Sequence, residues 1–154
     1  MRLIWIDAYS KYGGAEQVSN ANGVNTVRKF REIFAMVSDP EPIGSDNGTP
    51  FTSHEFGEFC SQHGIRHIRC APYHLATNRE AECFVQVFKR AIRSNSDYIL
   101  YSTFSSSASK FDTESEVHRF LLRYRTVPHS TTGRTPSELL FGRTIRTTLD
   151  LIRL

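Results

Sequence analysis

Long hydrophobic runs are missing from this chain of 154 residues. Because a transmembrane helix needs about 20 consecutive apolar residues, we expect no membrane-spanning segment. The N-terminal stretch, residues 1–7, is too short and too soon interrupted by charge to be a secretory signal. Cysteine is scarce as well. The odd set Cys60, Cys70 and Cys83 favours reduced intracellular thiols over a disulfide framework.

Lysine is also rare, since the 19 basic residues divide into 15 Arg and 4 Lys. The net charge of +3 alone is a weak sign of an anionic partner. Arginine contacts phosphate through two N–H groups and stacks on bases, so this composition tilts toward nucleic acid. A solvated basic surface and codon bias are the alternatives. Hydrophobic residues at 39% and charged residues at 23% are ordinary for one globular domain.

Local patterns predict an α/β fold with a mixed sheet flanked by helices. Gly13-Gly14 is read as the turn of a first hairpin. The serine-rich stretch 94–110 is expected to be a surface loop, and residues 143–154 an extension beyond a core of residues 1–142. The expected strands are 3–9, 15–19, a short strand from Ile43 to Asp46, and 65–70; the expected helices are 24–36, from 52 to about 62, from 78 to about 94, from 113, and from 135.

Two carboxylates are the strongest candidates for chemistry. Asp46 follows a short strand, at the strand end where open α/β sheets place ligands. Glu82 comes early on a helix that Asn78 is expected to cap. The 35 residues between Asp46 and Glu82 make one helix–strand excursion, which can bring Glu82 back to face Asp46. Such a pair can hold a divalent cation, and divalent metals drive in-line attack on phosphodiesters.

The helix of Glu82 is predicted to be amphipathic. An ordinary solvated face is the alternative to a DNA-contacting one. The polar face, at spacings of four, three and four, carries Glu82, Gln86, Lys89 and Arg93. The expected buried side carries Phe84, Val87, Phe88 and Ala91.

Seven segments stand in the order seen in a known family. They are 7–12 (DAYSKY), 45–49 (SDNGT), 71–74 (APYH), 77–78 (TN), 81–82 (AE), 124–133 (YRTVPHSTTG) and 135–143 (TPSELLFGR). Together they resemble the integrases of Gypsy-type LTR retrotransposons, over nearly the whole chain apart from the serine-rich stretch. The resemblance implies a ribonuclease H-like catalytic core. Such cores use magnesium or manganese to trim the 3′ ends of element DNA and join them to target DNA.

The same resemblance implies roles for individual residues. Asp46 and Glu82 would be catalytic metal ligands. It further implies element-end and target DNA as partners, a homo-oligomer, no membrane partner, and a nuclear location. The residues expected to contact DNA are Asn47, Tyr73, His74, Gln86, Lys89 and Arg93.

The chain also departs from the family pattern. The family's first catalytic Asp lies on a strand before the one that residues 3–9 resemble, and that strand is missing here. Asp7 matches a non-catalytic position, so its expected role is a strand-end hydrogen bond. We therefore expect the isolated chain to be inactive. The alternative function is a catalytically dead, nucleic-acid-binding or dimerising remnant of a transposable element. Further unusual residues are Gly13, Gly14, Leu75, Arg79 and Cys83.

One competing pattern resembles a zinc site. Its members are Cys60, His63, His67, Cys70 and His74. His67 and Cys70 stand three apart on a predicted strand and so should point to opposite faces, which disfavours zinc.

Overall fold

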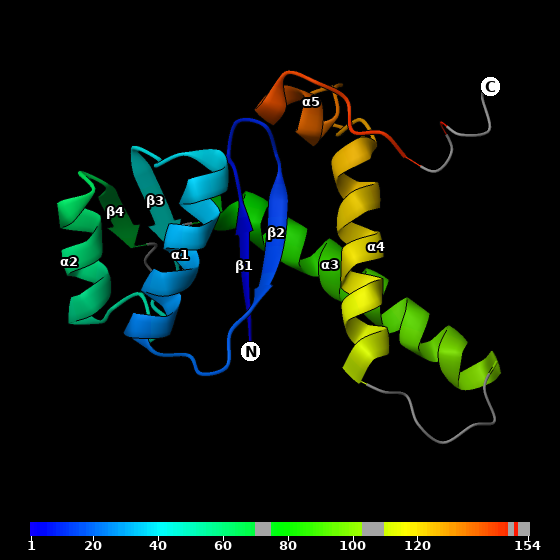
Figure 1. The fold of residues 1–154 in the computed structure, drawn as a ribbon, viewed down its shortest axis with the longest axis horizontal. Coiled ribbons are helices and arrows are strands. Elements are labelled where there is room, and N and C mark those ends of the chain that lie inside the picture. The colour runs from blue at the N-terminus through cyan, green and yellow to red at the C-terminus, as the bar shows by residue number, and fades with distance from the viewer. Residues whose placement is uncertain (70–74, 103–109, 148–149, 151–154) are drawn as a thin grey trace. The chain divides into compact units, whose positions relative to one another are not determined.

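In the computed structural model, the described residues are 1–69, 75–102, 110–147 and 150, without the side chains of 75–78, 94–102 and 110–113. They form two compact units. The first unit comprises Met1–Ile4 and Ala15–Glu82, and the second comprises Trp5–Gly14 and Cys83–Leu154. The elements are β1 (Arg2–Ile6), β2 (Gly13–Gln17), α1 (Gly23–Val37), β3 (Pro42–Ser45), α2 (His54–Gln62), β4 (Arg66–Arg69), α3 (Leu75–Ser102), α4 (Lys110–Thr126) and α5 (Pro136–Phe141) (Figure 1). This order of strands and helices is the predicted one.

The first unit is built around the parallel strands β3 and β4, with helices α1 and α2 beside them (Figure 1). Ile43 is paired with His67, and Ser45 with Arg69. The predicted mixture of antiparallel and parallel pairing is confirmed, although the described strands divide it between two sheets of two strands. The carboxyl ends of β3 and β4 therefore lie at one edge, followed by Asp46 and residue 70.

An aromatic cluster fills the first unit. Phe56 is fully buried, and its ring centroid lies 5.5 Å from that of Phe30, 5.4 Å from that of Phe51 and 6.2 Å from that of Phe59. Phe59 is also buried and stacks on Phe34 at 6.0 Å. Burying rings of this size is the main stabilising contribution available to so small a unit.

Local capping sets the ends of the helices in the first unit. Asn22 accepts a hydrogen bond from the Asn25 N–H, and α1 starts one residue before the predicted position. Ser53 caps α2 by accepting a hydrogen bond from the Phe56 N–H, one residue after Thr52, the cap position of the predicted capping box, so that prediction is wrong by one residue. Gly64, at φ 65°, follows the last turn and stops the helix.

The hairpin of β1 and β2 corrects one prediction, because Gly13-Gly14 opens β2 instead of forming the turn. The turn lies at residues 8–10, and Lys11 takes the positive φ of 62°. Asp7 accepts hydrogen bonds from the Ser10 N–H (2.7 Å) and hydroxyl (2.6 Å). The expected strand-end role of Asp7 is thus confirmed.

Close packing, and not turning, explains the two glycines. A Cβ at Gly13 would lie 2.5 Å from the Phe84 ring, and one at Gly14 would overlap the Trp5 indole. The Arg125 guanidinium donates two hydrogen bonds to the Gly13 carbonyl, at 3.0 and 2.9 Å. It also lies over the Tyr12 ring, 4.3 Å from its centroid. These contacts are long-range in sequence, so no local pattern announces them.

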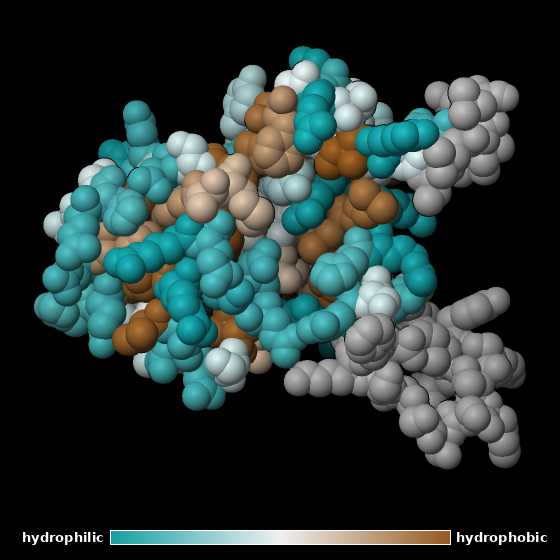
Figure 2. Space-filling view, viewed as in Figure 1, coloured by the Kyte–Doolittle hydropathy of each residue, from teal (hydrophilic) through white to brown (hydrophobic). Residues whose placement is uncertain are grey.

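The second unit packs α3 against α4 through aromatic side chains. The ring centroids of Phe84 and Tyr124 lie 4.8 Å apart, and those of Phe88 and Phe120 lie 5.5 Å apart. At α5, Thr135 accepts the Glu138 N–H and Pro136 takes the first turn, as predicted. Among the described residues, no helix has both the length and the apolar character to cross a membrane. In Figure 2, hydrophilic residues dominate the visible face.

Three predicted boundaries in this part of the chain are wrong. Helix α3 begins at Leu75, so Asn78 lies inside it, and it continues to Ser102 through half of the predicted loop 94–110. Nothing between Ser94 and Ser102 is glycine or proline, the residues that would stop a helix. Helix α4 begins at Lys110 and not at Thr113. Residues 103–109, the rest of the predicted loop, lie outside the described residues.

Candidate metal and nucleic-acid site

Asp46 stands directly after β3, at the carboxyl end of the parallel pair. Its side chain is exposed, and Oδ1 accepts a hydrogen bond of 2.9 Å from the Gly48 N–H. This two-residue turn is the one that Asp side chains commonly make. A Cβ at Gly48 would lie only 2.8 Å from Oδ1 of Asp46, so any larger residue at position 48 would push the carboxylate out of this place. The carboxylate is therefore both fixed and accessible.

Two polar side chains support the strand end from within. Ser45 is 6% exposed, and its hydroxyl donates to the Asp46 carbonyl at 3.0 Å. The same hydroxyl lies 2.7 Å from Nε2 of His67. Burial, and next the nearby Arg69 charge, lowers the pKa of His67. The sequence assigned His67 only to a zinc-like pattern and gave Ser45 no role. The signal that could have found them is the parallel register of the two strands.

Glu82 lies on α3 and is exposed. Its carboxylate makes no hydrogen bond or ion pair with any residue that the structure describes. Gln86, Lys89 and Arg93 follow it on the same continuous helix, and all three are exposed. The predicted amphipathic character is confirmed by the buried Phe84 and Phe88, but Val87 is 44% exposed and was wrongly assigned to the buried side.

The linking segment between β4 and α3, residues 70–74, lies outside the described residues, and so do the side chains of 75–78. The predicted DNA contacts Tyr73 and His74 fall in this segment. Asn47 is described and is exposed beside Asp46. The predicted approach of Glu82 to Asp46 stays a prediction, although both belong to the first unit.

The zinc-like pattern divides into separate contacts. Cys60 is 3% exposed, and burial raises the pKa of its thiol. His63 places Nδ1 2.9 Å from Oδ2 of Asp39, whereas His67 is bonded to Ser45. Within the described ranges, no three His, Cys, Asp or Glu side chains are grouped to hold a metal. Cys70 and His74 lie outside those ranges.

The donor chemistry of the two carboxylates nevertheless suits a hard divalent cation. Magnesium prefers oxygen ligands and is commonly bound by one or two carboxylates with water completing its shell. Asp46 uses one carboxylate oxygen in its turn with Gly48. The other oxygen and the exposed Glu82 carboxylate have no polar partner among the described residues, so they fit the role of metal ligands.

Residues 2–75 match the family model described as "Integrase core domain". The chain is 38% identical over 156 residues to "Uncharacterized protein K02A2.6" of Caenorhabditis elegans, covering 97% of this chain and 11% of that protein. It is 30% identical over 98 residues to the Gag-Pro-Pol polyprotein of Human T-cell leukemia virus 3 (strain Pyl43), covering 64% of this chain and 7% of that protein. The chain thus spans a small part of these relatives.

The fold is similar to that of the HTLV-2 integrase catalytic core domain solved in complex with magnesium in a trimeric form. The TM-score is 0.67 at 18% identity, with 90% of this chain and 83% of that chain covered. The similarity shows the ribonuclease H-like α/β fold. Residues 2–75 are thus similar in sequence to an integrase core domain, and the described residues share the α/β fold of a retroviral integrase core.

Proposed function

We propose that this chain is part of the catalytic core of a Gypsy-type LTR retrotransposon integrase, which trims the 3′ ends of element DNA and joins them to target DNA. The observation that carries the proposal is the exposed, fixed carboxylate of Asp46 at the carboxyl end of β3. The ordered motifs in the sequence and the match over residues 2–75 support it.

In this function Asp46 and Glu82 hold Mg²⁺ or Mn²⁺. The bound metal would activate the attacking oxygen and stabilise the leaving oxygen of the phosphodiester. Asp46 contributes an oxygen whose position is set by the Gly48 N–H. Glu82 contributes a carboxylate from the exposed side of α3. The magnesium in the solved HTLV-2 core domain supports this assignment for a protein of the same fold.

Only two of the family's three carboxylates match residues of these 154. We propose that the third comes from sequence outside them, and that the 154-residue chain alone is inactive. Asp7 does not supply it in this proposal, because its Oδ2 already accepts two hydrogen bonds from Ser10.

DNA would contact the polar side of α3 and the loop after β3. Lys89 and Arg93 offer charge to phosphates, and Asn47 and Gln86 offer amides. Tyr73 and His74 complete this set by resemblance alone. The solved HTLV-2 core domain is described in trimeric and dimeric forms, which supports the proposal that this chain acts as a homo-oligomer. A nuclear location is part of the same proposal.

DNA binding tests the α3 assignment. We expect Lys89→Glu and Arg93→Glu each to weaken binding of a fluorescent duplex and to lower the slope of log affinity against log salt by about 1. Arg28→Glu is the matched control, since Arg28 is an exposed cation on α1. Equal loss in all three variants would mean that net charge alone governs binding.

A nicking and strand-transfer assay in Mg²⁺ or Mn²⁺ tests the claim about catalysis. We expect no metal-dependent cleavage by the 154-residue chain. Cleavage that disappears in Asp46→Asn would contradict the claim that a carboxylate from outside is required.

A further inference from the structure

The buried Ser45 hydroxyl and the half-buried His67 ring form a polar pair next to the proposed metal ligand Asp46. We propose that Ser45 and His67 are positioning residues, which act in series to hold the strand end that carries the Asp46 carboxylate. The inference rests on the proposed function for its consequence, metal affinity, but the positioning itself is a property of the chain alone.

The hydrogen-bond inventory sets the direction of the chain of contacts. A serine hydroxyl has one proton, and that of Ser45 is donated to the Asp46 carbonyl at 3.0 Å. The 2.7 Å contact with His67 therefore needs a proton on Nε2, which donates to the Ser45 oxygen. Each donor polarises the next one in such a series. This assigns His67 the Nε2–H tautomer.

The surroundings hold both members in place. Ser45 is 6% exposed, so water competes little for its hydroxyl. The His67 ring meets the fully buried Phe56 edge-on, with centroids 5.0 Å apart. The register of β3 with β4 keeps His67 opposite Ile43 and so on the same side as Ser45. A hydrogen bond shielded in this way is stronger than an exposed one.

The consequence reaches Asp46 from two sides. Its carbonyl is held by Ser45, and its Oδ1 is held by the Gly48 N–H. Because both the main chain and the side chain of Asp46 are already fixed, a cation that binds there pays a smaller entropic cost for ordering the ligand. Outer partners of metal ligands typically contribute 10–100-fold to metal affinity. Because Ser45 acts through the main chain, we expect a contribution near the lower limit.

Three variants of the full chain separate the roles. Ser45→Ala removes the central hydroxyl. His67→Leu removes the donor, whereas His67→Gln keeps an N–H that can reach the same oxygen. His63→Leu is the matched control, since it removes another hydrogen-bonded histidine from the same unit. Thermal unfolding identifies any variant that fails to fold. If His67→Leu fails to fold, the comparison of Ser45→Ala with His67→Gln still decides the test.

Amide hydrogen exchange at Gly48 is the first readout and requires no metal. We expect exchange to rise about tenfold in Ser45→Ala and His67→Leu, and to stay near wild type in His67→Gln and His63→Leu. The ¹⁵N spectrum of the His67 ring should show the proton on Nε2. Unchanged exchange in folded Ser45→Ala, or a proton on Nδ1 alone, would overturn the proposal.

Mn²⁺ affinity, followed by electron paramagnetic resonance of the free ion, is the second readout. We expect about tenfold weaker binding in Ser45→Ala and His67→Leu, with His67→Gln and His63→Leu near wild type. Wild-type affinity in Ser45→Ala, in a chain where Asp46→Asn abolishes binding, would refute positioning while keeping the metal site. If even the wild-type chain fails to bind, the metal assignment is wrong, and the exchange data still decide positioning.

Discussion

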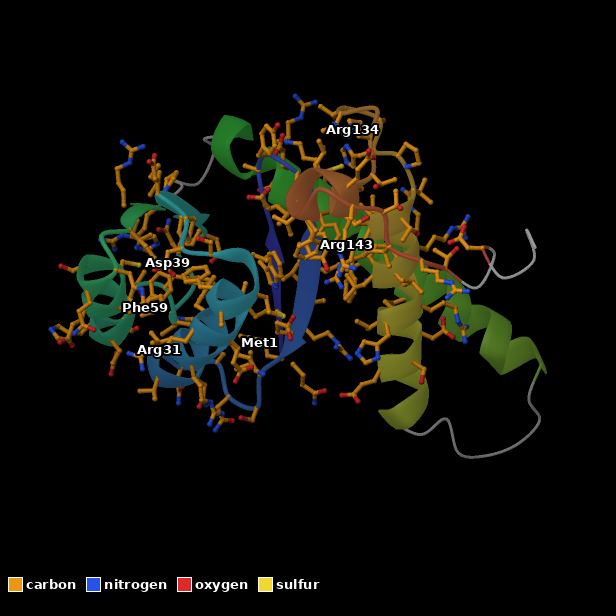
Figure 3. All side chains as sticks on the ribbon, turned by 45° about the horizontal axis from the view of Figure 1, so that its top comes forward. Met1, Arg31, Asp39, Phe59, Arg134 and Arg143 are labelled. Carbon is orange, nitrogen blue, oxygen red and sulfur yellow. The ribbon has the colours of Figure 1, made fainter. Side chains whose placement is uncertain are left out.

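The two units of this molecule place their polar groups for different purposes. In the first unit, which has an aromatic core, the exposed carboxylate of Asp46 is held by a hydrogen bond from the N–H of Gly48, only two residues away. In the second, Arg125 reaches across 112 positions to the Gly13 carbonyl and serves packing. The candidate site in the first unit therefore depends on hydrogen bonds between residues close in sequence, whereas packing in the second unit depends on contacts between residues far apart in sequence. Figure 3 shows the side chains on the ribbon, with Phe59 of the first unit and Arg134 of the second among those labelled.

The largest expected effect comes from the aromatic core of the first unit. Phe56→Ala should lower the free energy of unfolding by about 3–5 kcal/mol, since it removes a fully buried ring that packs against three other phenylalanine rings. Urea titration measures the loss. Phe141→Ala, at a residue 43% exposed, is the control and should cost much less. Equal losses would contradict the importance given to this cluster.

Close packing at Gly13 gives the next effect. Gly13→Ala should lower the free energy of unfolding by roughly 1–3 kcal/mol, because the new methyl group would meet the Phe84 ring. Gly57→Ala is the matched control. Gly57 is exposed within α2 with nothing near its missing Cβ, so alanine should stabilise the chain by about 0.5–1 kcal/mol. A neutral Gly13→Ala would mean that the second unit does not depend on this fit.

A smaller effect is expected from pH. The pKa of His67 in the folded chain lies below its ordinary value of 6.5. The unfolded chain therefore binds more protons, so the contribution of His67 is full above that value and is lost as the pH falls below it. His67→Gln should flatten the acid side of the stability curve in urea titrations from pH 7 to pH 5. Parallel curves for variant and wild type would refute this.

Thiol reactivity gives the mildest comparison of the two units. In a Cys70→Ser background, Cys83 is exposed and should react with a thiol reagent at neutral pH much faster than Cys60. Cys60 is buried, and its raised pKa leaves less thiolate. Mass spectrometry of labelled peptides gives both rates. Similar rates in folded protein would show that the first unit opens readily.

Local signals explain what could be predicted from the sequence. The cap at Thr135 works through a residue three positions away, so α5 began where expected, and α2 began within two residues of the expected position. The carboxylate of Asp46 was found because a turn and a strand end are also local features. The predicted roles of Gly13 and Gly14 failed because the contacts that demand glycine come from Phe84 and Trp5.

The missed residues of the site have a similar explanation. Ser45 and His67 are 22 positions apart, and only the parallel register of β3 and β4 brings them together. The predicted end of α3 was wrong because a local signal was given too much weight. Serine-rich composition suggested a loop, but helix propensities are weak and nothing in residues 94–102 breaks a helix.

The most direct test of the central claim is a Mn²⁺ titration of the folded chain, followed by electron paramagnetic resonance. Asp46→Asn and Glu82→Gln are compared with wild type, with Glu55→Gln as the control for an exposed carboxylate on α2. We predict that the first two variants each weaken binding at least tenfold and that the control binds as wild type does. Binding that survives in both Asp46→Asn and Glu82→Gln would contradict the assignment of these two carboxylates to a metal site.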